Sequence, residues 1–269
     1  MSGFPAILLV GCGKMGRAML DGWLEQGLAA EKILIAEPYA IDLPPALAQR
    51  RVEDAGKAPE NFKPEIVVLA VKPQSMAAVL PGLKKFAGAG TVFLSIAAGK
   101  TLAALGSGLG EARIVRTMPN TPAAVRQGIT VAVAGKGVDA GQRDACDGLL
   151  RAVGEVMWVQ DEGLLDAVTA VSGSGPAYVF LLAEAMAEAG VKAGLPRDLA
   201  EQLARATVSG SGELLRRSSD SAAQLRQNVT SPGGTTAEAL KVLMAPGAMQ
   251  KIFDEAIAAA TRRSRELAG

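Results

Sequence analysis

Short apolar runs alternate with helix-like segments over the first 160 residues. The runs are strand-sized and rich in branched side chains, at residues 6–10, 32–36, 66–71, 91–96, 113–116, 129–133 and 155–159. Several are continuously apolar, which is typical of strands covered by helices on both faces. The pattern predicts an α/β fold with a Rossmann-type, doubly wound, mainly parallel sheet.

The pattern changes near residue 160, after which it predicts helices only. A very apolar stretch runs from residue 164 to 193, an amphipathic helix from 196 to 215, and two closing helices over 237–243 and 247–267. The Ser-Gly-Ser-Gly-Pro sequence at 172–176 should kink or break the first stretch. We therefore predict a Rossmann-type domain over 1–160 and an all-helical domain over 161–269. The motifs and the resemblance described below imply that the first binds a dinucleotide and that the second serves in dimerisation and substrate binding.

The apolar stretch at 164–193 carries few charges before Glu184. A helix that is apolar on several faces is buried on several faces. Burial against a second subunit is the interpretation that we favour for so small a domain. A central helix in a monomeric bundle remains the alternative.

A glycine-rich turn joins the first strand to the first helix. Its sequence, Gly11-Cys12-Gly13-Lys14-Met15-Gly16, has G-x-G-x-x-G spacing and directly follows Val10. In such turns the first glycine allows the tight bend, the second lets a pyrophosphate approach the backbone, and the third lets the helix pack on the strand. The helix N-terminus then offers N–H groups and a positive dipole end to the phosphates. A flexible surface turn is the alternative, but the flanking strand and helix favour a dinucleotide site.

Three further residues follow predicted strands, at the edge where open α/β sheets bind ligands. Glu37 stands 21 residues after Gly16, where a carboxylate hydrogen-bonds the ribose hydroxyls of NADH and repels the 2′-phosphate of NADPH. NADH is therefore moderately favoured if Glu37 points into the site, although it could instead turn to solvent. Lys72 and Asn120 are either cofactor contacts or ordinary loop residues, and their position favours contact.

A second candidate site lies at residues 230–236, Thr-Ser-Pro-Gly-Gly-Thr-Thr. Glycines expose backbone N–H groups, hydroxyls stand among them, and a helix begins directly afterwards. N–H donors with a helix dipole and no bulky cation suit a small anion such as a carboxylate. An ordinary Pro-Gly turn with an N-cap threonine is the alternative interpretation.

The amino-acid composition limits which partners, compartments and catalytic groups are expected. There are 28 Lys and Arg against 27 Asp and Glu, which gives no electrostatic case for nucleic acid or a membrane surface. Two cysteines make no disulfide framework, and the first apolar run is too short for a signal peptide or membrane helix, so we expect a cytoplasmic protein. The chain has no histidine, which removes the commonest general base and the commonest zinc ligand, and we expect no metal.

Six motifs, taken together, resemble the pyrroline-5-carboxylate reductase family over nearly the whole chain. They are Gly11–Gly16, Ala70–Pro73, Ser95–Gly99, Met118–Pro122, Ser172–Tyr178 and Ser231–Thr236, in the family's order and with similar spacing. The resemblance implies NAD(P)H-dependent reduction of 1-pyrroline-5-carboxylate to L-proline, the last step of proline biosynthesis. It also implies a homodimer through the helical domain, with the active site completed across the interface. The family often forms larger rings of dimers, which the sequence itself does not show.

The residues that we expect to bind the cofactor, from the motif match and from position, are Val10, Gly11, Cys12, Gly13, Lys14, Met15, Gly16, Glu37, Ala70, Val71, Lys72, Pro73, Ala97, Ala98, Gly99 and Asn120. Those expected to bind the substrate are Ser231, Gly233, Gly234, Thr235 and Thr236. The resemblance gives Thr236 the catalytic role, a hydrogen bond to the ring nitrogen.

The absence of histidine agrees with this chemistry. An alcohol dehydrogenase needs a base to take the hydroxyl proton, whereas an imine that is protonated before it binds needs mainly positioning and a hydride. A β-hydroxyacid dehydrogenase is one alternative, but it uses a lysine on the first long helix of its second domain, and residues 164–190 contain none. A non-catalytic NAD(H)-sensing regulator is another, and it would need an effector surface that the sequence does not indicate.

Overall fold

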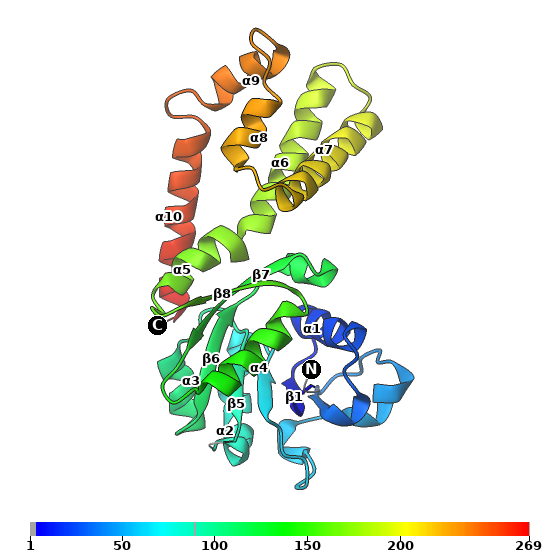
Figure 1. Ribbon diagram of the computed structural model, residues 1–269, viewed down its shortest axis with the longest axis vertical. Coiled ribbons are helices and arrows are strands. Elements are labelled where there is room, and N and C mark those ends of the chain that lie inside the picture. The colour runs from blue at the N-terminus through cyan, green and yellow to red at the C-terminus, as the bar shows by residue number, and fades with distance from the viewer. Residues whose placement is uncertain (1–3, 89, 269) are drawn as a thin grey trace. The chain divides into compact units, whose positions relative to one another are not determined.

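The computed structural model describes residues 4–88 and 90–268, which form two compact units (Figure 1). Unit 1 contains the residues up to Gly173 and those from Thr261 onward, and unit 2 is Ser174–Ala260. The predicted domain boundary at 160/161 falls just after the last strand, whereas unit 1 continues through the next helical turns, which contact β6. No strand follows residue 161 in the described part of the chain.

Unit 1 is built on one eight-stranded sheet with the order β3-β2-β1-β4-β5-β6-β7-β8. The strands are β1 (Ile7–Val10), β2 (Ile33–Ala36), β3 (Arg51–Val52), β4 (Ile66–Leu69), β5 (Val92–Ser95), β6 (Arg113–Met118), β7 (Gly128–Ala134) and β8 (Gly154–Val159). All neighbours are parallel except β6 and β7. The mainly parallel, doubly wound sheet predicted from the apolar runs is confirmed.

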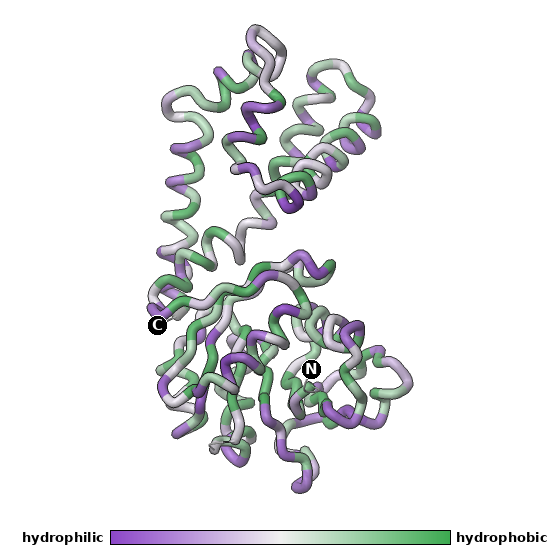
Figure 2. Tube along the Cα trace, in the orientation of Figure 1, coloured by the Kyte–Doolittle hydropathy of each residue, from purple (hydrophilic) through white to green (hydrophobic). Residues whose placement is uncertain are grey.

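Helices cover both faces of this sheet, as the continuous apolar strands require. In β1, Ile7 and Leu9 join the core that contains Trp23 of α1 (Lys14–Glu25) and Leu149 of α4 (Ala140–Arg151). Leu8 and Val10 point to the opposite core, formed with α2 (Met76–Leu83) and α3 (Leu102–Leu109). Figure 2 shows these strands as the hydrophobic centre of unit 1.

Unit 2 consists of helices α6 (Gly175–Lys192), α7 (Arg197–Arg217), α8 (Ala222–Asn228), α9 (Thr235–Leu243) and the first part of α10 (Met249–Ala268). Helices α6 and α7 pack against each other, and the rings of Tyr178 and Phe253 meet edge to face at 6.3 Å. The predicted break at 172–176 is present. Helix α5 (Leu164–Val168) passes into a π-helical turn at Thr169–Gly173, and α6 begins anew with Pro176 in its first turn, where a missing N–H costs little.

The stretch Leu164–Lys192 is the one described segment that is long and apolar enough to cross a membrane, judged by length and composition alone. Only 11% of its most apolar window is buried within the chain. Phe180 and Leu181 are each 62% exposed on α6. So much uncovered apolar surface is typical of a face that another molecule covers.

Candidate cofactor and substrate sites

The sheet reverses its winding direction between β1 and β4, which are neighbours. In doubly wound sheets, the crevice outside the carboxyl ends of the strands at such a point binds ligands. The glycine turn follows β1 there, and Ala70–Pro73 follows β4. The two segments are joined directly, because the Ala70 N–H donates to the Val10 carbonyl at 2.8 Å.

The three glycines of the turn differ in the space around them. Gly11 has a φ of +89°, and a Cβ there would lie 2.9 Å from the carbonyl carbon of Ala70. A Cβ on Gly16 would lie 2.5 Å from the Gly11 carbonyl oxygen. Both positions therefore exclude side chains for reasons internal to the fold, as the sequence predicted.

Gly13 is different, because a Cβ there would meet nothing within 4 Å. It is exposed, and it is the N-cap of α1 with no side chain hydrogen-bonded to the helix end. The fold itself does not require glycine here, whereas the close approach of a ligand to the backbone does. An unblocked helix N-terminus beside open space fits a pyrophosphate, so the residues present fit a bound dinucleotide.

Glu37 is turned into the site and not toward solvent. It is 8% exposed, and its Oε2 accepts the Cys12 N–H at 2.8 Å while Oε1 accepts the Tyr39 N–H at 3.2 Å. The carboxylate thus lies against the glycine turn, at the end of β2, where the adenosine ribose of a dinucleotide binds. Contact between Glu37 and the ribose hydroxyls remains a prediction.

Cys12 lies inside the turn but is not a nucleophile. Burial raises the pKa of its thiol to about 11, and the Arg17 guanidinium opposes that shift only in part. The thiol therefore stays protonated near neutral pH, which makes it unreactive. Its backbone N–H, which Glu37 accepts, is the part of Cys12 that shapes the site.

The remaining predicted cofactor segments also follow strands at this edge. Lys72 is exposed after β4, and Ala97–Gly99 follow β5, with Gly99 at a φ of +70°. Asn120 follows β6 and is buried, and its side-chain oxygen accepts the Ile129 N–H at 2.9 Å. That bond gives Asn120 a structural role in closing the 120–129 loop, and cofactor contact stays a prediction for it. Ser75 precedes α2 without a capping hydrogen bond from its side chain.

A supporting carboxylate was missed by the sequence analysis. Glu162 Oε1 accepts the Leu102 N–H at 2.8 Å and the Arg116 guanidinium at 2.6 Å. The Arg116 side chain is only 6% exposed, so the pair is largely shielded from water. Leu102 begins α3 shortly after Ala97–Gly99. The hydrogen bond from its N–H to Glu162 therefore fixes the end of the loop that contains these residues. Leu102 and Arg116 lie 60 and 46 positions before Glu162 in the chain, so no local sequence pattern indicates these contacts.

The predicted substrate residues lie together in unit 2, ahead of α9. Gly233 has a φ of +70°, and the Gly234 N–H closes a turn onto the Ser231 carbonyl at 3.1 Å. Helix α9 starts at Thr235 with no side-chain cap, and Thr236 is in its first turn. The first N–H groups of a helix have no intrahelical partner. The donors that this helix start offers to an anion are therefore the N–H groups of Thr235, Thr236 and Ala237, since the Gly234 N–H is already used and the Glu238 N–H bonds the Gly234 carbonyl.

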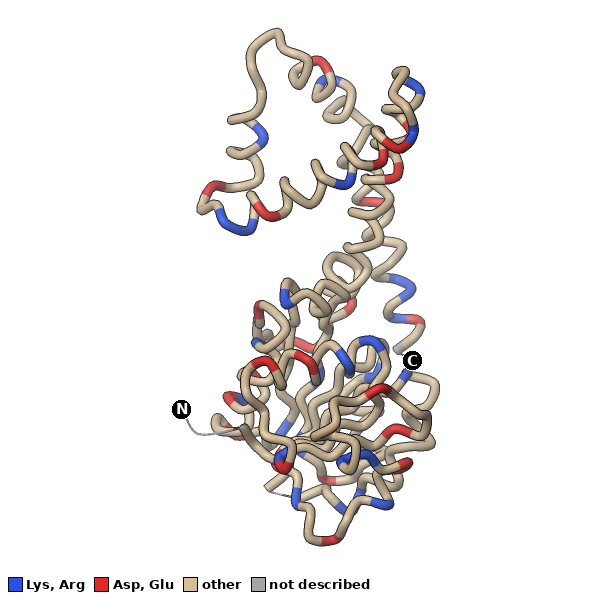
Figure 3. The backbone as a smooth tube through the Cα atoms, turned by 90° about the vertical axis from the view of Figure 1, so that its right-hand side faces the viewer, with Lys and Arg blue, Asp and Glu red and all other residues tan. Residues whose placement is uncertain are grey.

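Lysine and arginine are intermingled with aspartate and glutamate along both units (Figure 3). Within residues 4–88 and 90–268, no group of three or more Cys, Asp or Glu side chains is gathered as a metal site.

The fold and the first site define a Rossmann-type, NAD(P)-binding oxidoreductase. Residues 6–99 match the family model described as NADP oxidoreductase, coenzyme F420-dependent, and residues 162–267 match the model for pyrroline-5-carboxylate reductase dimerisation. The chain belongs to the pyrroline-5-carboxylate reductase family, which confirms the resemblance.

Relatives of that name align over nearly their full length. The pyrroline-5-carboxylate reductase of Pseudomonas aeruginosa is 41% identical over 98% of this chain and 97% of the relative, and that of Synechocystis is 42% identical over 96% and 97%. A Coxiella burnetii structure superimposes with a TM-score of 0.91 at 36% identity, covering 99% and 100% of the two chains. A Plasmodium falciparum pyrroline carboxylate reductase structure with NADP bound superimposes with a TM-score of 0.83 at 29% identity, covering 98% of each chain.

Proposed function

We propose that this chain reduces 1-pyrroline-5-carboxylate to L-proline with NAD(P)H. The observation that carries the proposal is its 41% identity, over 98% of its length, to a pyrroline-5-carboxylate reductase. The open backbone at Gly13 and the uncapped N-terminus of α9 support it, because they offer anion sites for a dinucleotide and for a carboxylate.

When bound, the reduced nicotinamide supplies a hydride. The hydride forms the new C–H bond at the C=N carbon, and the π electrons move to the nitrogen, which already carries a proton. The chain's task is therefore positioning. The Thr235 and Thr236 amides hold the substrate carboxylate, and the Thr236 hydroxyl oxygen accepts the N–H of the iminium. Ser231, Gly233 and Gly234 shape the turn around it.

The decisive assay follows the loss of reduced-nicotinamide absorbance with 1-pyrroline-5-carboxylate, in parallel with NADH and NADPH. Turnover with either cofactor supports the proposal. Tight cofactor binding without turnover would instead favour the NAD(H)-sensing alternative. The β-hydroxyacid dehydrogenase alternative is not favoured, since α5 and the part of α6 up to Gly190 lack the lysine it needs.

The exposed apolar side chains of α6 support a homodimer formed through residues 162–267, in line with the predicted partner interface. We place the protein in the cytoplasm, where NAD(P)H is available and the free thiols of Cys12 and Cys146 stay reduced. A larger ring of dimers remains an expectation from the resemblance.

We expect NADH to be preferred, because Glu37 is held in the ribose region by two backbone N–H groups. A charge pair about 5 Å apart at an effective dielectric of 20 amounts to about 3 kcal/mol. Glu37→Gln, which keeps the shape and removes the charge, should raise the NADPH-to-NADH ratio of kcat/KM by about 100-fold.

Glu31→Gln is the matched control for this ratio. Glu31 is an exposed carboxylate in the short turn before β2, at the opposite end of that strand from Glu37. It should leave the cofactor ratio unchanged. An unchanged ratio in Glu37→Gln as well would remove Glu37 from cofactor selection.

A further inference from the structure

Arg126 has an unusual backbone conformation. Among residues 4–88 and 90–268 it is the one non-glycine residue with a positive φ, at φ 59° and ψ 22°. This left-handed region is unfavourable for residues with a Cβ, and it persists only where surrounding contacts require it. Such outliers gather at functional sites, so the contacts of Arg126 indicate what it does.

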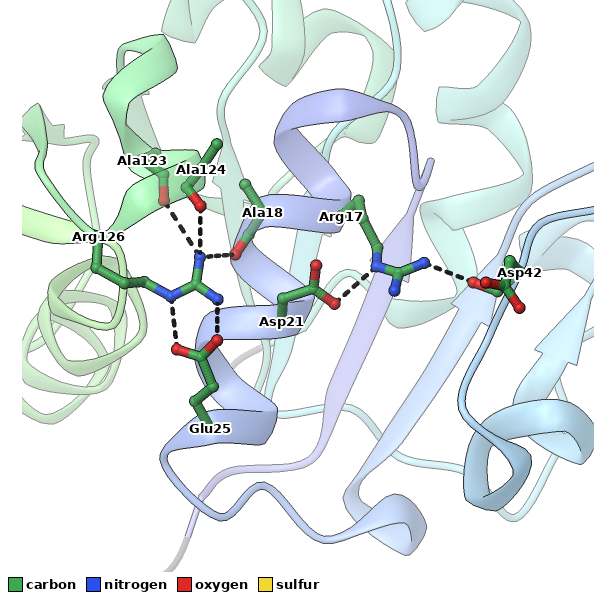
Figure 4. A network of polar contacts seen from close by, with 8 residues as sticks. All are labelled: Arg17, Ala18, Asp21, Glu25, Asp42, Ala123, Ala124 and Arg126. Carbon is green, nitrogen blue, oxygen red and sulfur yellow. Dashed lines mark hydrogen bonds and ion pairs between the residues drawn. The ribbon is translucent and has the colours of Figure 1, made fainter.

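The Arg126 guanidinium makes five hydrogen bonds to two segments of the chain (Figure 4). Nε and Nη2 donate to the two carboxylate oxygens of Glu25 at 2.9 and 2.7 Å, a bidentate arrangement. Nη1 lies 3.3 Å from the carbonyl oxygens of Ala18 and Ala123, and 3.4 Å from that of Ala124. The side chain is three-quarters buried.

These contacts join two segments that both carry predicted cofactor residues. Ala18 and Glu25 belong to α1, whose N-terminus is the proposed pyrophosphate site. Ala123 and Ala124 belong to the short 3-10 helix η6 (Thr121–Val125), which directly follows Asn120. Strands β4 and β5 separate β1 from β6 in the sheet, so neither segment fixes the other through strand pairing. Helix η6 does pack on α1, and Arg126 provides the polar link between them.

We propose that Arg126 is a positioning residue for the cofactor site. It fixes the loop that begins at Asn120 against the flank of α1, and so sets the spacing between the pyrophosphate-binding turn and the next contact along the dinucleotide. The Asn120–Ile129 hydrogen bond closes the same loop from its other side. This proposal rests on the cofactor half of the proposed function and is independent of the substrate's identity.

The test separates positioning from plain stability. Arg126→Gly removes all five hydrogen bonds, while glycine adopts the left-handed conformation without strain. The Glu25 side chain is 64% exposed, so its ion pair with Arg126 adds only modest stability, and glycine also relieves the strain of the left-handed backbone. We expect a melting temperature within a few degrees of wild type. The dissociation constants of NADH and NADPH, titrated by nicotinamide fluorescence, should both rise about 5- to 10-fold, with an unchanged KM for 1-pyrroline-5-carboxylate.

Two further variants complete the experiment. Glu25→Gln should weaken both cofactors in the same direction but less, because the carbonyl contacts of Arg126 remain. Arg151→Gln, which breaks the surface pair with Asp147 on α4, is the control and should change neither cofactor constant.

A lower melting temperature in Arg126→Gly with unchanged cofactor constants would overturn the proposal and leave Arg126 as a structural link. If that variant does not fold, unchanged constants in Glu25→Gln would overturn it equally. Wild-type protein that binds neither cofactor would refute the proposed function itself. Wild-type binding without turnover would refute only its substrate half.

Discussion

Replacing Gly13 with alanine is expected to leave the fold intact and to weaken NADH and NADPH binding about 10- to 100-fold. Apart from Gly13 and the two residues that adjoin it, no protein atom lies within 4 Å of the added methyl group, so folding has no steric reason to resist it. The methyl would occupy the space through which a pyrophosphate reaches the backbone N–H groups. Charge-assisted hydrogen bonds of this kind contribute about 1.5–3 kcal/mol, which corresponds to the expected loss of affinity. Fluorescence titration and a thermal melt measure the two quantities separately.

Gly16→Ala is the matched comparison, because the same methyl group there meets the Gly11 carbonyl oxygen at 2.5 Å. Backbone atoms cannot yield as a flexible side chain does, and overpacking costs about 1–3 kcal/mol even where side chains give way. We expect Gly16→Ala to lower the free energy of unfolding by at least about 2 kcal/mol. Equal stability losses at both positions would contradict the assignment of Gly13 to ligand approach.

The parts of unit 1 that the sequence predicts correctly are those where a single element determines its own pattern. A strand buried on both faces must be continuously apolar, so β1 and β4 are evident from composition alone. The two-residue β3 is too short to have a pattern. Helix α3 was not predicted although Thr101 caps it, since its glycines resemble a loop.

The site's supporting contacts could not be predicted because they join residues far apart in the chain. Arg126 and Glu25 are 101 positions apart, and no local signal links them. The direction of Glu37 was open for a similar reason. A carboxylate after β2 can face solvent or the glycine turn, and only the folded position of the Cys12 N–H decides between them. Motif spacing predicts which residue types meet a ligand, whereas tertiary contacts decide how each side chain is held.

Thr236→Ala should lower kcat/KM for 1-pyrroline-5-carboxylate about 10- to 100-fold while leaving the dissociation constants of NADH and NADPH unchanged. A hydrogen bond to a charged group contributes about 1.5–3 kcal/mol, and here it orients the nitrogen whose neighbouring carbon receives the hydride. Thr236 is in the first turn of α9, where alanine is a good helix former, so the loss will not reflect unfolding of the helix.

Thr236→Ser separates the hydroxyl from the methyl group. It retains the oxygen that accepts the iminium N–H, so most of the activity should return, whereas a role in packing alone would leave serine close to alanine. The iminium already carries its proton in this mechanism, so the Thr236 oxygen acts as an acceptor that orients the N–H and not as a proton donor. Under the proposed function, orientation of the ring nitrogen depends on the Thr236 hydroxyl. Full activity and unchanged substrate KM in Thr236→Ala would move that role elsewhere in the 231–236 turn.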